Sequence, residues 1–471
     1  MYPVDVHYMS EPTQDYLKSC LETVLQIHMR EPPGDILVFL TGADEVMSLT
    51  QTIHELGGKG WQGLTLTATP LFGALDFDRQ LEAFGDTSPG TRKVVIATNI
   101  AETSVTIPGI VYVIDCMFVK MRSYNAKLGI DMLTVMPVSK ASATQRAGRA
   151  GRVRAGKCYR LCTEDVFISQ LCEMTIPEMQ RAELTSVVLQ LKALGIDDVL
   201  HFDFPSPPPA LTLARALEIL YALGAVDDDA KLAEPLGVQL AEFPLEPMLA
   251  KFLLTSGQAG CSEEALSIAA MLSVPHVFLS DSLSDEKSAR HHYAVKEGDH
   301  LTLLNVYNAF EAAKRNPQWS VARHVNHRSM KHACETRKQL ANYISKLEIP
   351  LVSCGRDSRT LRRTITGAFF CNAAKLEADG SYRTIRGQQR VHVHPLSVLH
   401  QHPSAWVLFN ELTLSTKPYI LGVLQIEPQW LSELAPHFYK FKGAKGTDLE
   451  GGGGPGEEAS EAPSRKQQRR A

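Results

Sequence analysis

Short, continuously apolar runs in the first third of the chain constrain its fold more than any other feature. They span Asp35–Leu40, Lys93–Thr98 and Ile110–Asp115, and turn-forming or polar residues bound each run. A strand that is apolar on both faces is typical of a parallel sheet covered on both sides. Helical patterns lie at 14–30 and 76–84. Strands that alternate with helices predict an α/β layer, with ligand-binding loops at the carboxyl ends of the strands.

The alternation of strands and helices breaks after residue 115. Met117–Ser123 and Gly129–Val138 flank the turn-like segment Tyr124–Lys127, and this order predicts an antiparallel hairpin. A last strand is expected at Lys157–Cys162. We therefore expect the first domain to end near residue 165.

The rest of the sequence predicts several smaller domains. Two helical stretches, Glu183–Leu194 and Ala210–Leu223, precede a short apolar–polar segment, and together they resemble a winged helix. Residues 236–345 are rich in helical patterns, whereas short alternating segments from Asp357 to Trp430 predict a small antiparallel barrel. The glycine-rich and acidic sequence after residue 442 predicts a disordered tail. Its basic end is either a solvated charge run or a nucleic-acid-binding or nuclear-import segment.

Composition narrows the class of protein. The 471 residues suit about three domains of roughly 150 residues each. The net charge is −4, so nucleic-acid binding requires local basic patches. Nine cysteines occur without a CxxC pair, and Cys158, Cys162 and Cys172 lack zinc-ligand spacing. This usage favours reduced thiols in the cytosol or nucleus. No apolar run approaches the roughly 18 residues of a membrane span, and the N-terminus does not resemble a secretory signal.

An arginine repeat follows the expected hairpin. Gln145–Arg152 reads QRAGRAGR, which places Arg146, Arg149 and Arg152 three residues apart, with a glycine before each of the last two. Residues at i and i+3 lie on one side of a helix, so Arg149 and Arg152 can point at the same target. Guanidinium groups present planar donor forks that suit phosphate oxygens. The repeat predicts either a polyphosphate clamp or a solvated basic helix end, and its spacing alone does not decide between them.

An ordered series of motifs resembles one known family. Ala97–Ile107 reads ATNIAETSVTI, and with QRAGRAGR it resembles motifs V and VI of the superfamily 2 helicases, in the form found in DEAH-box RNA helicases. VFLTG at Val38–Gly42 resembles motif IV. The resemblance continues through later segments to about residue 441, namely Leu189–Ile196, Leu240–Lys251, Met271–Phe278, Glu297–Tyr307 and Trp430–Tyr439.

The family resemblance implies a multidomain α/β architecture. We expect a second RecA-like domain, a winged helix, a helical ratchet-type domain, a C-terminal OB-fold and a disordered tail. The expected bounds are 1–165, 166–235, 236–345, 346–441 and 442–471, in that order.

The resemblance also implies an ATP site. Arg149 and Arg152 would be arginine fingers on the γ-phosphate, and Gln145 would help to place that phosphate or the attacking water. Fixed cations suit this role because charge spreads over the phosphoryl oxygens in the transition state. Ser104 and Thr106 would lie on the loop that senses the nucleotide. Phe84 matches a phenylalanine that stacks on adenine, although a core aromatic on a helix is about as good a reading.

RNA contacts are implied at the ends of two expected strands. Thr41 and Gly42 follow the first strand, and Thr98 and Asn99 end the second. Their hydroxyls and backbone amides would hold RNA phosphates, which fixes register without reading sequence. The alternative for Thr98 is a plain strand-end cap. Lys120, at the start of the hairpin, is a weaker candidate for the RNA backbone, and an exposed lysine is the competing interpretation.

The parts that would complete an ATP site do not occur in the sequence. There is no GxxxxGK[ST] phosphate loop and no DEAH-type acidic motif for magnesium. The chain therefore resembles the C-terminal portion of a DEAH helicase, without the first RecA-like domain. ATP with Mg²⁺ is the implied cofactor, with the magnesium ligands on the other domain. We expect either the motor-completing part of a 3′–5′ RNA helicase or an ATPase-inactive RNA- or protein-binding module. A DNA helicase fits the C-terminal domains less well.

The implied partners are RNA, a ribonucleoprotein complex and a glycine-rich G-patch activator, with no membrane. Family members act in splicing, ribosome assembly and RNA sensing. The implied location is the nucleus, in the nucleoplasm or nucleolus, with the cytoplasm as the alternative.

Overall fold

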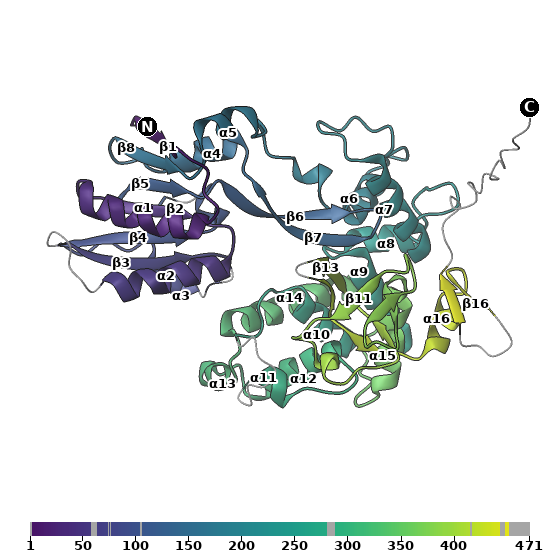
Figure 1. Cartoon of the computed structure of the whole chain (residues 1–471). Coiled ribbons are helices and arrows are strands. Elements are labelled where there is room, and N and C mark those ends of the chain that lie inside the picture. Colours follow the sequence, from purple (N-terminus) through teal and green to yellow (C-terminus); the bar gives the residue numbers. More distant parts are fainter. Residues whose placement is uncertain are drawn as a thin grey trace, which may run out of the picture. The chain divides into compact units, whose positions relative to one another are not determined.

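The computed structural model describes residues 2–57, 64–73, 75, 77–103, 106–279, 288–414, 417–442 and 448–451. The chain forms two compact units (Figure 1). The first contains residues 1–123 and 133–178, and the second contains residues 124–132 and 179–471.

A parallel sheet forms the centre of the first unit. Within the described residues it has six strands in the order β1-β8-β5-β2-β4-β3, and each neighbouring pair is parallel. The strands are β1 (Val4–Tyr8), β2 (Asp35–Phe39), β3 (Thr65–Leu71), β4 (Thr91–Ala97), β5 (Ile110–Asp115) and β8 (Gly156–Arg160). The sheet confirms the expected α/β layer, because the three apolar runs form neighbouring buried strands.

Sequence patterns failed to identify two strands, β1 and β3. Both lie at edges of the sheet, where β1 pairs only with β8 and β3 only with β4. An edge strand has a neighbour on one side alone and tolerates polar residues. Accordingly β1 carries three exposed residues among its five, and β3 is rich in threonine. Neither strand shows the continuous apolar run that marks a central strand.

Helices cover both faces of this sheet. One face packs against α1 (Tyr16–Arg30) and α2 (Ala43–Gly57) through one alternate set of strand residues, including Val38 and Ile96. The other alternate set, including Phe39 and Ala97, faces α4 (Lys140–Ala147). Two further helices belong to this unit, α3 (Phe77–Glu82) and α5 (Glu164–Ser169). Asp76, expected in α3, lies outside the described residues.

The expected hairpin consists of β6 (Phe118–Asn125) and β7 (Ile130–Pro137), which are neighbours in a second sheet. Its end, residues 124–132, belongs to the second unit. There β7 pairs in parallel with β13 (Glu411–Leu414). The Tyr124 amide also donates a 2.6 Å hydrogen bond to the Arg181 carbonyl. The hairpin therefore starts in one unit and ends in the other.

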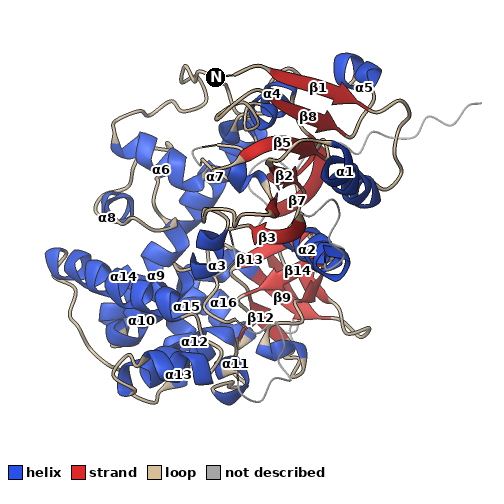
Figure 2. Ribbon diagram, turned by 90° about the vertical axis from the view of Figure 1, so that its left-hand side faces the viewer, coloured by secondary structure: helices blue, strands red, loops and turns tan. Residues whose placement is uncertain are grey.

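The second unit is mainly helical (Figure 2). A bridge between Val226 and Leu232 closes the short hairpin that follows α7. The α-helices of this unit are α6 (Thr185–Ala193), α7 (Ala210–Leu223), α8 (Leu236–Glu242), α9 (Pro247–Ala259), α10 (Ser262–Leu272), α11 (Ala289–His292), α12 (Asp299–Ala312), α13 (Pro317–Ala322), α14 (His327–Lys346), α15 (Ser358–Phe369) and α16 (Pro428–Leu434).

Short strands form a mixed sheet in the second unit. Most of its pairs are antiparallel, as expected for the segment from residue 357 to 430, but β11 pairs with β14 in parallel. The strands are β9 (Ala373–Leu376), β10 (Tyr382–Thr384), β11 (Arg390–Val393), β12 (Trp406–Leu408), β13, β14 (Pro418–Leu421) and β15 (Leu424–Gln425).

Part of the expected tail is a strand. Residues 448–451 form β17 (Asp448–Gly451), which pairs with β16 (Tyr439–Lys442) in an antiparallel ladder. The remaining tail, including Arg465–Arg470, lies outside the described residues. The pairing gives these four residues a regular structure that their glycine-rich, charged sequence did not predict.

A buried polar contact joins the helices to the mixed sheet of the second unit. The Asp299 carboxylate, at the start of α12, accepts hydrogen bonds from the amides of Val398 (3.0 Å) and Val423 (2.8 Å). Burial raises the pKa of Asp299. Next to it, His300 Nε2 lies 2.8 Å from Asn410 Oδ1, and burial lowers the pKa of His300 to about 4. At neutral pH the imidazole is therefore uncharged and donates to the amide oxygen.

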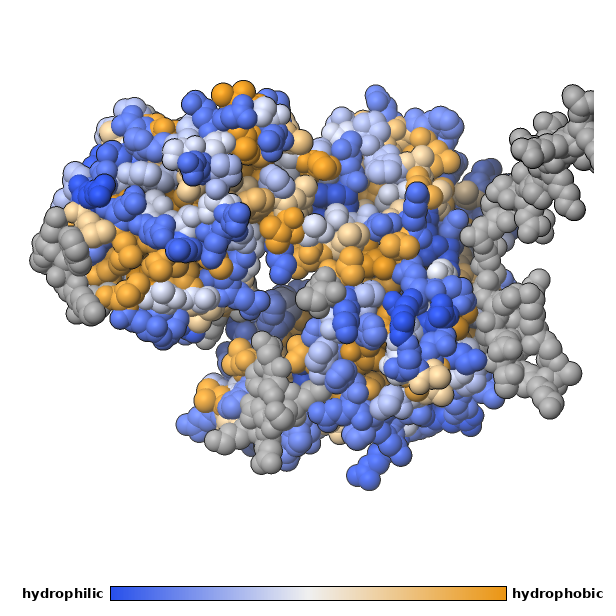
Figure 3. Space-filling view, viewed as in Figure 1, coloured by the Kyte–Doolittle hydropathy of each residue, from blue (hydrophilic) through white to orange (hydrophobic). Residues whose placement is uncertain are grey.

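Side chains of the two units present a mixed surface. The face shown in Figure 3 is largely hydrophilic, with separate apolar patches. The most exposed large apolar residues are Leu194, Val321 and Met174. Among the described residues, none of the helices combines the length and apolar character needed to cross a membrane.

Candidate functional site

The arginine repeat lies at the end of a short helix beside the sheet. Ser139 caps the start of α4 through a hydrogen bond to the Ser142 amide, and Gly148 ends it. Only the first arginine of the repeat is therefore helical. Arg149 and Arg152 lie in the turns that follow, before β8.

Both later arginines contact one loop. Arg149 donates a hydrogen bond from its guanidinium to the Glu102 carbonyl, and Arg152 donates to the Thr106 hydroxyl. This loop follows β4 and the short 3-10 helix Asn99–Ala101. The repeat and the loop are about 46 residues apart in sequence, and the fold brings them together at the carboxyl edge of the sheet.

Electrostatics at Arg149 favour an anion. Burial and the positive charge of Arg152 lower the pKa of Arg149, whereas Glu102 raises it. Both arginine side chains are only partly buried. Two cationic forks at one edge of the sheet are suited to bind phosphate oxygens, because charge-assisted hydrogen bonds of this kind are strong.

Arg146, in contrast, is fully buried and structural in its contacts. Its Nε donates to Glu102 at 2.9 Å, and one Nη donates to Asp115 at 2.8 Å and to the Phe118 carbonyl at 3.2 Å. Its guanidinium carbon lies 4.9 Å from the centre of the Phe39 ring. Burial alone would lower the pKa of Arg146, but the Asp115 and Glu102 carboxylates outweigh it and raise that pKa. The repeat thus contains two kinds of arginine.

The other candidate ATP-site residues differ in their exposure and contacts. Gln145 is exposed on α4. Thr106 is exposed and accepts the hydrogen bond from Arg152, while Ser104 lies outside the described residues. Phe84 is partly buried and packs against the core on the α4 face of the sheet. The carbonyls on either side of it, those of Ala83 and Gly85, accept hydrogen bonds from buried Lys93 at 3.1 and 2.6 Å.

The candidate RNA residues follow two adjacent strands. β2 and β4 are parallel neighbours, with Phe39 opposite Ala97. Thr41 and Gly42 follow β2, and Thr98 and Asn99 follow β4, so all four lie at the carboxyl edge of the sheet.

Their immediate contacts differ. Glu45 accepts hydrogen bonds from both the amide (3.0 Å) and the hydroxyl (2.7 Å) of Thr41, so an RNA phosphate would have to exchange with this carboxylate. The Thr98 side chain makes no capping hydrogen bond to the 3-10 helix, which removes the simplest capping role. Lys120 is exposed, and its Cδ lies 3.8 Å from the position that a Cβ atom would take at Gly42. The fold therefore brings Lys120 next to Gly42.

The two glycines of the repeat serve different purposes. A Cβ atom at Gly151 would lie 2.5 Å from the Tyr2 carbonyl oxygen and 2.8 Å from Val4, so the N-terminal strand occupies the space that glycine leaves. A Cβ at Gly148 would meet only carbonyls of its own helix, at 3.3 Å or more. At Gly151 the N-terminal segment of the chain itself thus makes the close approach that a glycine allows.

Gly151→Ala is expected to destabilise the first unit by about 2 kcal/mol, because overpacking against fixed backbone costs roughly 1–3 kcal/mol. Gly148→Ala, in a helical conformation with little obstruction, is the matched control and should change stability by less than about 1 kcal/mol. Thermal unfolding of the two variants measures the difference. Equal melting temperatures would contradict this assignment.

One stretch approaches the spacing of a phosphate loop without matching it. Gly151–Cys158 reads GRVRAGKC, with cysteine where the loop requires serine or threonine. Gly156 and Lys157 lie inside β8, and the Lys157 ammonium pairs with Glu31 at 2.8 Å. Lys157 lies within a strand and is paired with a carboxylate. The segment therefore does not form a phosphate-binding loop.

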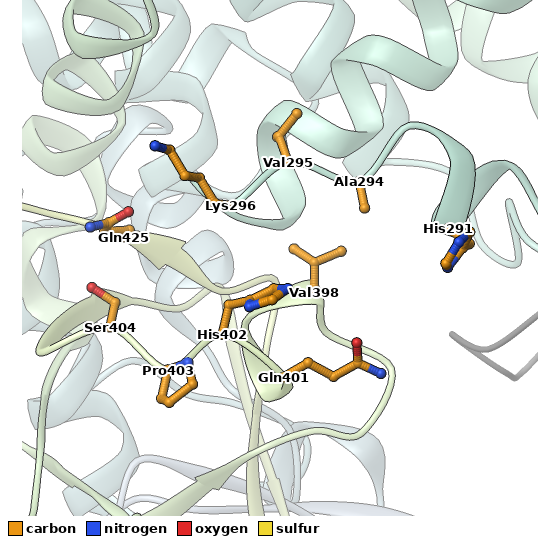
Figure 4. A pocket seen from close by; sticks show the side chains of 10 residues that line it. All are labelled: His291, Ala294, Val295, Lys296, Val398, Gln401, His402, Pro403, Ser404 and Gln425. Atoms are coloured by element: carbon orange, nitrogen blue, oxygen red, sulfur yellow. The ribbon is translucent and has the colours of Figure 1, made fainter.

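A separate cavity of about 620 Å³ lies in the second unit (Figure 4). None of the candidate residues predicted from sequence lines it. Among the described residues that line it are two histidines and one lysine, and none of these described residues is a carboxylate. The lining comprises His291, Ala294, Val295, Lys296, Val398, Gln401, His402, Pro403, Ser404 and Gln425.

Sequence reasoning missed the residues that hold Arg146 and the loop after β4 in place. Glu102, Asp115 and Ser142 contact Arg146 or its partner directly. Glu102 lies within the ATNIAETSVTI segment, and Asp115 ends an otherwise apolar strand. A charged residue at the end of a buried strand was the unused signal, because such a charge needs a partner of opposite sign.

Four family models match the chain in order. The helicase conserved C-terminal domain matches residues 17–154, and the winged-helix helicase associated domain (HA2) matches 216–245. The ratchet-like helicase associated domain (HA2) matches 246–303, and the oligonucleotide/oligosaccharide-binding (OB)-fold matches 361–439. These matches confirm the expected order of a RecA-like domain, a winged helix, a ratchet-like domain and an OB-fold.

Curated relatives cover nearly the whole chain. It is 49% identical to the probable ATP-dependent RNA helicase DHX35 of Pongo abelii over 445 residues, which are 93% of this chain and 62% of the relative. The human protein of the same name is 48% identical over 445 residues, covering 93% and 63%. The pre-mRNA-splicing factor ATP-dependent RNA helicase prp22 of Schizosaccharomyces pombe is 44% identical over 447 residues, covering 94% and 38%. The chain thus spans less than two thirds of each relative.

Proposed function

We propose that this chain, which belongs to the DEAH-box RNA helicases and corresponds to their C-terminal portion, completes the motor of an ATP-dependent RNA helicase. In this function it couples ATP hydrolysis to 3′–5′ movement on RNA and to remodelling of RNA or ribonucleoprotein. The domain bounds expected from sequence, with breaks near residues 165, 235, 345 and 441, are part of the proposal.

The observation that carries the proposal is the placement of Arg149 and Arg152. Both reach the loop after β4, at the edge of the sheet where ligands bind in α/β folds. In the motor these arginines would leave their loop partners and stabilise charge on the γ-phosphate, with Gln145 placing the attacking water. Thr106, which accepts from Arg152, would sense whether the phosphate is present.

ATP with Mg²⁺ fits only partly on this chain. Arg149, Arg152 and Gln145 would hold the γ-phosphate, Phe84 would contact adenine, and Ser104 and Thr106 would belong to the sensing loop. The sequence contains no phosphate loop or DEAH-type motif, so the magnesium ligands would come from another RecA-like domain. When bound, ATP supplies the phosphoryl group whose transfer drives the motor.

RNA would lie along the strand ends. Thr41, Gly42, Thr98 and Asn99 follow adjacent strands, and Lys120 lies beside Gly42. Contacts of this kind hold the phosphate backbone and carry little sequence preference. Substrate choice would therefore depend on partners, for which we propose a G-patch activator or a ribonucleoprotein complex.

Splicing is the process that the name of one relative favours. The Schizosaccharomyces pombe protein carries pre-mRNA splicing in its name, which supports a nuclear location. Ribosome biogenesis in the nucleolus and a cytoplasmic role are the alternatives within the family.

A binding module is the second candidate function. It is favoured by the sequence, which contains no phosphate loop, and by the basic cavity in the second unit. In this case the chain acts by holding RNA or protein, and the arginines have no catalytic role.

Two proteins separate these functions. One is the 471-residue chain. The other, the joined protein, adds to its N-terminus a first RecA-like domain with a GxxxxGK[ST] phosphate loop and a DEAH motif, taken from a DEAH-box RNA helicase. We expect negligible ATP hydrolysis by the chain and RNA-stimulated hydrolysis by the joined protein, because the phosphate loop and the arginines must meet. Binding of a labelled single-stranded RNA is measured for both by fluorescence anisotropy.

If the joined protein binds RNA but hydrolyses no ATP, the binding module is favoured and the motor proposal fails. ATP hydrolysis by the chain without the added segment would contradict the division of the ATP site between two domains.

A further inference from the structure

One buried cation, Arg146, contacts the loop after β4 and the ends of three strands in the first unit. Arg146 donates hydrogen bonds to Glu102 in the loop after β4, to Asp115 at the end of β5, and to the Phe118 carbonyl at the start of β6. It also lies over Phe39, the last residue of β2. The Arg146 side chain is itself fully buried.

We infer that Arg146 is a positioning residue. It couples the loop after β4, which Arg149 contacts, to the start of the β6–β7 hairpin. The inference rests on the motor function proposed above and names a residue that this function did not require. Arg146 touches neither phosphate nor RNA in this scheme and acts through Glu102 and Phe118.

Glu102 is the first link. Its carbonyl accepts the hydrogen bond from Arg149, while its carboxylate is held by Arg146 at 2.9 Å and by the Ser142 hydroxyl at 2.6 Å. Only 15% of the Glu102 side chain is exposed. When Arg149 leaves this carbonyl for a phosphate, the loop loses one restraint, and the two hydrogen bonds that hold the Glu102 carboxylate both come from α4.

Phe118 is the second link. It begins β6, and two residues later Lys120 lies beside Gly42. Arg146 holds the Phe118 carbonyl and the Asp115 carboxylate with the same Nη atom. A shift of Glu102 is therefore passed through a rigid planar group to the strand that leads to Lys120. Arginine suits this role better than lysine, because its fork binds several acceptors in fixed directions.

Arg146→Lys in the joined protein is the test. Lysine keeps the charge next to Asp115 but cannot hold Glu102 and Phe118 together. We expect the ratio of RNA-stimulated kcat to RNA-free kcat to fall about fivefold, in line with coupling changes along such networks. The KM for ATP and the affinity for RNA should remain within about twofold of the wild-type values, because neither ligand contacts Arg146.

Three further variants distinguish a loss of coupling from a loss of stability. Arg92→Lys changes another buried arginine, near the start of β4 and away from the candidate site. Arg92 donates hydrogen bonds to the Ile27 and Glu31 carbonyls. It should lower the melting temperature while leaving the kcat ratio unchanged. Ser142→Ala removes only the hydroxyl that holds Glu102 and should lower the ratio in the same direction, whereas Thr144→Ala, which removes an exposed hydroxyl bond to the Lys140 carbonyl in the same helix, should not.

Failure of the inference about Arg146 can be distinguished from failure of the proposed motor function. A wild-type joined protein without RNA-stimulated hydrolysis overturns the proposed function. An active wild type with an unchanged kcat ratio in both Arg146→Lys and Ser142→Ala overturns this inference alone. A ratio that falls equally in Arg92→Lys also overturns it, because the loss would then follow from destabilisation of the sheet. If Arg146→Lys does not fold, Ser142→Ala against Thr144→Ala decides.

Discussion

Arg149→Ala in the joined protein is expected to lower the kcat of RNA-stimulated ATP hydrolysis by about 10³-fold, the lower end of the effect of an arginine finger. The guanidinium would stabilise charge that develops only in the transition state, so the KM for ATP should change far less than kcat. Arg149 and Arg152 contact the same loop, and we expect Arg152→Ala to reduce kcat in the same way. Steady-state hydrolysis at saturating RNA measures both constants.

Arg154→Ala is the control for this substitution. Arg154 lies two residues beyond the repeat, is exposed, and donates to the Pro33 carbonyl. Its loss removes a nearby positive charge without touching the loop, so kcat should stay within about twofold of wild type. If Arg149→Ala keeps more than about a tenth of the wild-type kcat, the arginine does not act on the phosphate.

Gly298→Ala is expected to reduce the free energy of unfolding of the second unit by at least about 3 kcal/mol. Gly298 has φ +129° and ψ −171°, a region that is essentially restricted to glycine. A Cβ atom there would lie 2.3 Å from the Val423 carbonyl oxygen and 2.9 Å from the Leu424 Cα, and both are backbone atoms. Relief would require α12 to withdraw from the mixed sheet, which breaks the contacts of Asp299.

Urea unfolding of the 471-residue chain, followed by tryptophan emission, measures this effect. Trp319, Trp406 and Trp430 all belong to the second unit. Gly260→Ala is the matched control, because Gly260 also has a positive φ (+75°) but nothing lies within 4 Å of a Cβ placed there. Backbone strain alone should cost about 1–2 kcal/mol at Gly260. Equal losses in the two variants would show that the contact with Val423 adds nothing.

The sheet of the first unit was predictable where strands are buried on both faces. β2, β4 and β5 form neighbouring pairs and appear in the sequence as continuous apolar runs. The edge strands β1 and β3 were not recognised, because an edge places fewer demands on its residues. Local pattern therefore identified the centre of the sheet and missed its borders.

The candidate site shows a similar division. Spacing in the repeat pointed to Arg149 and Arg152, and both contact one loop. The same spacing grouped Arg146 with them, yet Arg146 is buried with carboxylates 44 and 31 residues away. Helical periodicity holds only as far as α4 continues, and it ends at Ala147. Partners at such sequence separations are set by the tertiary fold, which no local pattern describes.

The path of the hairpin has a consequence for dividing the protein into pieces. The polypeptide passes between the two units three times, after residues 123, 132 and 178. Cleavage at 178 alone would leave Asp131 and Met132 paired with β13, so we expect the two fragments to remain associated like the halves of a split protein. Expressed without its C-terminal partner, the first fragment would instead present β7 as an open edge, which invites aggregation.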